Sequence, residues 1–217
     1  MTSVWRYFTD HQSDIMGWLW TTVWLAVVPV AVGLVIALPL GWICNRYRWT
    51  YPPITSAAGI LYTIPSLVLF IVLPGILGTK ILDPVNVAVA LTVYTLALLV
   101  RVVADGLNSV SLDTLASASA MGYTGRQRLF AVQLPIAVPV IGAGVRVAAV
   151  SNVSLISVAS IIGVSQLGQL FIAGNVDNQI PPIVLGLIMF FLLAIVFDVV
   201  ILLIIRVLTP WQRAAAR

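Results

Sequence analysis

Five long apolar segments constrain the fold of this chain more than any other feature. They cover roughly residues 17–44, 54–78, 85–106, 134–163 and 181–208. Each reaches about 20 residues or more, the length that an α-helix needs to cross a bilayer. The chain is 61% hydrophobic and 8% charged, whereas a soluble domain carries about 25% charged residues. The sequence therefore predicts an all-α membrane protein with five transmembrane helices in a single domain over residues 17–208.

The positions of the arginines orient these segments, because cytoplasmic loops carry an excess of Lys and Arg. With five spans and the N-terminus outside, the cytoplasmic ends receive Arg46, Arg48, Arg101, Arg126, Arg128, Arg206, Arg213 and Arg217. Two spans in the long fourth segment would move the C-terminal arginines across the membrane. We therefore expect residues 1–16 to form an extracytoplasmic tail and residues 209–217 a cytoplasmic tail. The net charge of +4 reflects this bias and does not indicate nucleic-acid binding.

The longest polar interruption lies in residues 107–133, which this topology places in the cytoplasm. Ser111 or Asp113 can cap a short helix that runs to Met121, where Gly122 supplies a C-terminal stop. The face of this helix is predicted to include Leu112, Leu115, Ala116 and Ser119, which follow helical spacing. We therefore expect this polar interruption between two spans to be a folded helical element and not a plain linker.

A second short helix is predicted directly after the first. Thr124 and Gln127 have the T-x-x-Q spacing of a capping box, and Pro135 lies close to the start of the fourth span. Two interpretations of the pair remain open. The small side chains favour a compact helical knob that docks against a cytoplasmic partner. Alternatively, the segment lies on the lipid headgroups and is anchored there by Arg126 and Arg128.

The stretch from Ala116 to Pro135 resembles the EAA loop of ATP-binding-cassette importer permeases, in which E-A-A-x-x-x-G precedes I-x-L-P. The matching positions here are Ala116, Ser117 and Ala118, then Gly122, and finally Val132, Leu134 and Pro135. The resemblance implies that this loop couples the membrane domain to a separate ATPase. The residues implied in coupling are Ala116, Ser117, Ala118, Gly122, Arg126, Leu134 and Pro135.

Three further stretches resemble permeases for glycine betaine, choline and carnitine: LYTIPSLVLFIVLPGILG, VQLPIAVPVIGAGVRVA and SIIGVSQLG. The resemblance implies a permease subunit of an osmoprotectant importer, in the plasma membrane of a bacterium or archaeon. Its implied partners are cytoplasmic ATPase subunits, a second permease chain and an extracytoplasmic substrate-binding protein. ATP hydrolysis would then take place on a partner and not on this chain. A permease for another small solute, such as an amino acid, remains the alternative.

Two departures from the family pattern bear on assembly. Ala116 occupies the position of the glutamate in E-A-A, and Asp113, one turn earlier, replaces it only in part. The family's glycine-rich G-A-G-G-L-G turn becomes the stretch from Gly163 to Gly168, GVSQLG. These departures favour a heterodimer over a homodimer, with the glutamate retained on the second permease chain.

Charged and aromatic residues within the spans are the remaining candidates for function. Arg146 lies well inside the fourth segment, where an unpaired charge is costly. It either contributes to the translocation path or pairs with a carboxylate, for which Asp105 and Asp198 are available. Tyr62 offers an aromatic face to a cationic solute, although aromatic residues near span ends more often anchor a helix in the interface. Pro65 permits a kink in the second span.

Enzymatic chemistry has little support in this sequence. There is no metal-ligand cluster of His and Cys, no phosphate-binding glycine loop and no recognisable pairing of a nucleophile with a base. We therefore predict no catalytic residue, metal or cofactor for this chain. An intramembrane enzyme or a purely structural membrane subunit is the less favoured class of function.

Overall fold

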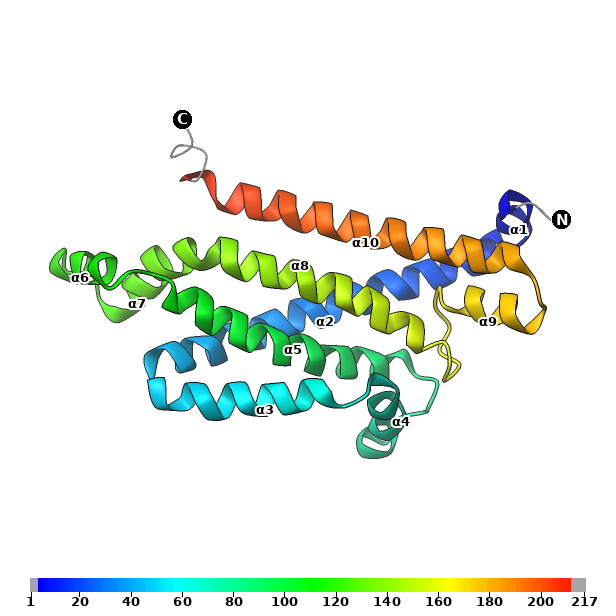
Figure 1. The fold of residues 1–217 in the computed structure, drawn as a ribbon, viewed down its shortest axis with the longest axis horizontal. Coiled ribbons are helices and arrows are strands. Elements are labelled where there is room, and N and C mark those ends of the chain that lie inside the picture. Colours follow the sequence, from blue (N-terminus) through cyan, green and yellow to red (C-terminus); the bar gives the residue numbers. More distant parts are fainter. Residues whose placement is uncertain (1–3, 212–217) are drawn as a thin grey trace.

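The computed structural model describes residues 4–211, and this part of the chain is helical with no β-strand. The elements in chain order are α1 (Val4–Asp10), α2 (Gln12–Arg46), η1 (Arg48–Thr50), α3 (Tyr51–Thr63), α4 (Ser66–Leu77), α5 (Pro84–Asn108), α6 (Leu112–Ala120), α7 (Gly125–Arg128), η2 (Leu129–Gln133), α8 (Leu134–Val158), α9 (Gln169–Val176) and α10 (Ile180–Leu208). The long helices form an elongated bundle, with α6 and α7 at one end and α1 and α9 at the other (Figure 1).

Four or five candidate membrane crossings account for the apolar segments. Four helical segments of the described chain are long and apolar enough to span a bilayer: α2, α5, the run from α7 to α8, and α10. The candidate for a fifth crossing is the pair formed by α3 and α4, which pass the same test together and are bent by 100° at a short break. After α8 the chain turns into the short helix α9, so the long fourth segment crosses once. The predicted all-α membrane fold is confirmed, with four candidate spans, or five when the bent pair is counted as one span.

The second span differs from the continuous helix that was predicted over residues 54–78. It breaks at Ile64 and Pro65, both of which have extended backbone angles. A proline disfavours the helical conformation of the residue before it, and it has no amide proton to donate. The break exposes backbone groups inside the bundle. The Tyr94 hydroxyl donates a hydrogen bond to the Ile64 carbonyl oxygen, which compensates for one lost helical bond.

The two ends of the chain also differ from the predicted boundaries. The expected polar tail of residues 1–16 contains α1, and α2 already begins at Gln12. Helix α1 packs against α10, so this part of the tail belongs to the folded bundle. Residues 1–3 and 212–217 lie outside the described part of the structure, and so does most of the predicted C-terminal tail.

Helix α5 is the central element, and its 25 residues span about 37 Å. Helix α2 packs closely along it at two glycines. A Cβ atom added at Gly33 would lie 2.6 Å from Thr95 Cγ2, and one added at Gly41 would lie 2.5 Å from Val103 Cγ1. These glycines therefore permit the two backbones to approach closely, which is a common way to join helices inside a membrane.

Candidate functional site

Helix α6 is a short projection at one end of the bundle, and its start is fixed by a local hydrogen bond. The Ser111 hydroxyl oxygen accepts a hydrogen bond from the Thr114 amide at 3.2 Å. Of the two predicted caps, Ser111 is therefore the N-cap, while Asp113 lies in the first turn. A negative charge in the first turn of a helix is favourable because the free amide groups there carry partial positive charge.

The end of α6 is fixed by a glycine in the left-handed conformation. Gly122 has φ +85°, and its amide donates to the Ser119 carbonyl at 3.0 Å. The Tyr123 amide donates to the Ala118 carbonyl at 3.2 Å. These two bonds together form a Schellman motif, which stops the helix and turns the chain sharply. Gly122 therefore acts as the predicted stop signal and sets the direction in which α6 projects.

The second short helix begins as predicted but continues into the membrane. The Thr124 hydroxyl and the Gln127 side chain form both bonds of a capping box. Helix α7 then runs through the π-helical turn η2 into α8 without a break. The wide turn ends where the Leu134 amide donates to the Leu129 carbonyl, directly before Pro135. In a regular helix, a proline ring would collide with the carbonyl group four residues earlier, and the wider turn relieves this collision.

The predicted coupling residues are grouped on α6, α7 and the start of α8. Ala116, Ser117, Gly122 and Arg126 are exposed, Leu134 and Pro135 are half-buried, and Ala118 is buried. Two large apolar side chains are also exposed here, Leu112 at 73% and Met121 at 69%. Arg128 fixes α6 to α7 by donating to the Ser119 hydroxyl at 2.7 Å.

The charged pair within the spans joins α8 to α10. Arg146 Nε lies 2.7 Å from Asp198 Oδ1, and Arg146 Nη2 lies 2.9 Å from Asp198 Oδ2. This two-point contact matches the planar guanidinium to the carboxylate. The second candidate partner, Asp105, instead accepts a hydrogen bond from the Tyr51 hydroxyl and lies 3.7 Å from Arg101 Nε. The structure therefore selects Asp198 as the partner of Arg146.

Tyr62 and Pro65 lie on either side of the break between α3 and α4. Tyr62 is partly exposed, and its ring meets the ring of Tyr94 edge to face with centroids 5.8 Å apart. Tyr94 also holds the Ile64 carbonyl at the break. Tyr94 on α5 therefore contacts Tyr62 before the break and holds Ile64, the residue before Pro65.

A comparison with known families decides what this architecture is. The family described as "Binding-protein-dependent transport system inner membrane component" matches residues 33–213. That range includes the broken second span, the α6 projection and the Arg146–Asp198 pair. The chain belongs to this family. It is a multi-pass permease subunit of an ATP-binding-cassette transporter in the inner membrane, and the ATPase of such a system is a separate chain.

Several curated relatives resemble the permease over nearly its whole length. The osmoprotectant import permease protein OsmW of Salmonella typhimurium is 33% identical over 208 residues, which cover 94% of this chain and 96% of the relative. The glycine betaine/carnitine/choline transport system permease protein OpuCD of Bacillus subtilis is 29% identical, with 95% and 90% coverage. The carnitine transport permease protein OpuCD of Listeria monocytogenes is 30% identical, with 94% and 91% coverage.

Solved structures support the fold of the permease. A chain of the MetNI methionine ABC transporter in an inward-facing conformation superposes with a TM-score of 0.83 at 21% identity, covering 92% of this chain and 98% of the other. A chain from a structure described as an amino acid ABC transporter with histidines superposes with a TM-score of 0.73 at 18% identity, covering 92% and 96%. At these identities the likeness shows the shared fold alone. Permeases of this family work with ATPase subunits, a second permease chain and a substrate-binding protein.

Two buried polar contacts of the permease were not predicted from the sequence. Asn152 Nδ2 on α8 donates to Thr95 Oγ1 on α5 at 2.9 Å. The Thr22 hydroxyl on α2 accepts from the Leu167 amide at 3.0 Å, in the turn before α9. The polar run that includes Asn152 was a usable signal, because polar side chains inside a bundle need partners. The Thr22 contact joins residues 145 positions apart, and no local pattern indicates it.

Within residues 4–211, no group of three or more His, Cys, Asp or Glu side chains is placed to hold a metal ion. Two polar pairs of the spans instead join neighbouring helices, Arg146 with Asp198 and Asn152 with Thr95. The arrangement is that of a helical scaffold with one projecting short helix, α6, connected to the spans through α7 and α8.

Proposed function

We propose that this permease is the membrane subunit of an importer for osmoprotectants, the class that includes glycine betaine, choline and carnitine. The observation that carries this proposal is the similarity to OsmW, because it extends over 94% of this chain and 96% of the relative. The names of the Bacillus and Listeria relatives point to the same class of solute. The solutes named for them share a quaternary ammonium group.

An amino-acid importer is the second candidate function. The likeness to the MetNI methionine transporter favours it, but that likeness rests on 21–22% identity and supports the fold alone. A binding experiment separates the two candidates. The cognate substrate-binding protein is titrated with glycine betaine, choline, carnitine and methionine by calorimetry. Our proposal expects saturable binding of at least one quaternary ammonium compound. Binding of methionine alone would favour the second candidate.

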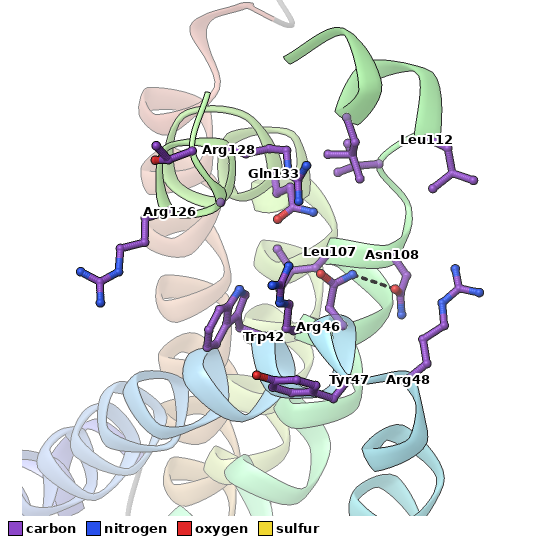
Figure 2. A pocket seen from close by; sticks show the side chains of 15 residues that line it. Trp42, Arg46, Tyr47, Arg48, Leu107, Asn108, Leu112, Arg126, Arg128 and Gln133 are labelled. Atoms are coloured by element: carbon purple, nitrogen blue, oxygen red, sulfur yellow. Dashed lines mark hydrogen bonds between the residues drawn. The ribbon is translucent and has the colours of Figure 1, made fainter. Parts of the chain in front are cut away.

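The topology is part of the proposal. The N-terminus lies outside and α6 lies in the cytoplasm, where the ATPase is found. The arginine distribution supports this orientation, since Arg46, Arg126 and Arg128 all lie at the α6 end of the bundle (Figure 2). In this orientation the exposed side chains of Leu112, Ala116 and Met121 face the partner ATPase.

Coupling in this scheme passes along a continuous helix. Closure of the ATPase dimer pushes on α6, which is joined to α7 by the Arg128–Ser119 hydrogen bond. Helix α7 continues through η2 into α8 as one helical segment from Gly125 to Val158. The Arg146–Asp198 pair connects α8 to α10. A displacement of α6 would therefore be transmitted to two spans together, which alternates access to the central path.

The Arg146–Asp198 pair is also our candidate for the wall of the translocation path. Both side chains keep about one third of their surface exposed, at 35% and 31%. Charged groups inside spans face a water-filled cavity or another helix, and not lipid. Tyr62 and Pro65 at the break of the second span belong to the same proposed path. Uptake is measured for Arg146→Ala and Tyr62→Ala at matched protein levels. Unchanged uptake in both variants would contradict a role in the path.

The second permease chain is the remaining partner, and we propose that it is a different polypeptide. Ala116 lies exposed on α6 where the family pattern carries a glutamate. A heterodimer would supply one acidic side chain through its other half. Blue-native gels compare this chain expressed alone with the chain expressed beside its neighbouring genes. A stable homodimer that binds the ATPase would contradict the heterodimer while leaving the osmoprotectant proposal intact.

A further inference from the structure

A cavity of about 550 Å³ lies between the end of α2, the end of α5, and helices α6 and α7 (Figure 2). Four arginines line it, Arg46, Arg48, Arg126 and Arg128, and no acidic residue does. Among residues 4–211, none of these four guanidinium groups has a carboxylate partner. Figure 2 shows Arg46 and Arg128 turned toward the middle of the cavity, with Arg48 and Arg126 at opposite sides of it. The described chain does not neutralise this positive charge, and such a site attracts an anion.

One amide side chain opens onto this cavity without a hydrogen-bond partner. Gln133 lines the cavity, and its side chain makes no hydrogen bond to the described residues, although the residue as a whole is only 7% exposed. Its amide atoms are not among the fully buried polar atoms of the described chain, so they are accessible from the cavity. In Figure 2, Gln133 lies beside Arg128, and Arg46 extends toward both of them from α2. On the opposite wall of the cavity, the Asn45 side-chain amide of α2 donates a hydrogen bond to Asn108 Oδ1 of α5 at 2.8 Å. The Gln133 amide is therefore free to donate a hydrogen bond to a ligand oxygen in the cavity.

An apolar groove of about 380 Å³ continues from the charged cavity. Trp42, Leu107 and Arg126 line both spaces. The groove follows α2 back to Leu38, about 12 Å from Arg46 along the helix axis. Its other wall includes Phe130, which is 67% exposed. A charged cavity that opens into an apolar groove beside membrane-spanning helices fits a molecule with an anionic head and a hydrocarbon chain.

We infer that this composite site binds an anionic glycerophospholipid, with its phosphate headgroup among the arginines and one acyl chain in the groove. Clusters of basic side chains between transmembrane helices are suited to lipid phosphates. An acidic segment of a partner protein would use the arginines but would leave the apolar groove empty. The site adjoins Arg126 and Arg128 of α7, so the bound lipid would hold the base of the α6 projection against α2.

Native mass spectrometry of the permease complex, purified with its partners in detergent, tests this inference. The probes are phosphatidylglycerol and phosphatidylcholine with identical acyl chains. We expect selective retention of phosphatidylglycerol. The double variant Arg46→Gln with Arg48→Gln should weaken that binding by about 10- to 30-fold, because each basic residue near a lipid headgroup contributes about fivefold. Arg101→Gln, which lies outside both spaces, is the matched control and should change binding less than about twofold.

The two parts of the site are tested separately. Leu38→Trp fills the groove and should weaken phosphatidylglycerol binding while leaving the arginines in place. Soluble glycerol 3-phosphate is the probe for a free anion, and binding as tight as that of the lipid would overturn the lipid assignment. Equal retention of the two phospholipids would overturn it as well. Loss of the ATPase from the double variant, with lipid retention unchanged, would identify the cavity as a protein contact and refute the inference.

Discussion

The turn at Gly122 offers a clean test of coupling, because a substitution there changes backbone conformation and little else. Gly122 has φ +85°, and a Cβ atom built on it meets nothing within 4 Å. The Cβ atom of a valine would therefore cause no collision, but this β-branched residue strongly disfavours a positive φ. Left-handed geometry costs an L-residue about 1–2 kcal/mol. Gly122→Val should thus lower the population of correctly oriented α6 by about 5- to 30-fold.

Gly125→Val is the matched control for this test. Gly125 is also exposed, lies three residues away and has open space around its Cβ position, but it does not have a positive φ. The assay is co-purification of the ATPase and ATP-driven uptake at equal membrane levels of each variant. We expect Gly122→Val to lose most of both, and Gly125→Val to lose much less. Equal behaviour of the two variants would refute the argument that this turn orients a coupling helix.

Three further predictions concern the spans. Gly41→Ala should lower the free energy of unfolding by about 1–2 kcal/mol, because the new methyl group collides with α5. Gly59→Ala is the control and should not lower it, because nothing lies within 4 Å of its Cβ position. Equal thermal shifts for the two variants would contradict the close α2–α5 contact. Asp198→Asn should lower protein level and uptake by leaving Arg146 without its carboxylate. Removing both charges should restore protein level, and a double variant as poorly expressed as Asp198→Asn would argue against the pair. Asn152→Ala should cost about 0.6–1.7 kcal/mol in thermal stability, and an unchanged melting temperature would contradict a stabilising role.

The short helices could be predicted closely because their signals are local. Ser111, Gly122 and the Thr124–Gln127 capping box each act within a few residues, so residue type and spacing were sufficient to locate α6 and the start of α7. The number of spans was equally accessible, because apolar length and arginine placement are properties of the chain itself. Local sequence determines these features, and tertiary packing is not needed to predict them.

Contacts between distant segments were less accessible. Pro65 permitted a kink in the second span, but the 100° bend is held by Tyr94, which lies 30 residues from Ile64. The choice of Asp198 over Asp105 for Arg146 depends on how α8 packs against α10. The helical N-terminal tail was missed because its polar sequence gave no apolar run, and its contact with α10 lies at the far end of the chain.

The most direct test of the proposed function is solute accumulation in proteoliposomes. The permease is reconstituted with its ATPase, its second permease chain and its binding protein, and radiolabelled glycine betaine, choline, carnitine and methionine are offered in turn. We expect ATP-dependent accumulation of at least one of the three quaternary ammonium solutes, with loss of accumulation in Gly122→Val. Accumulation of methionine alone, or glycine betaine, choline or carnitine uptake that continues without ATP, would contradict the proposed function.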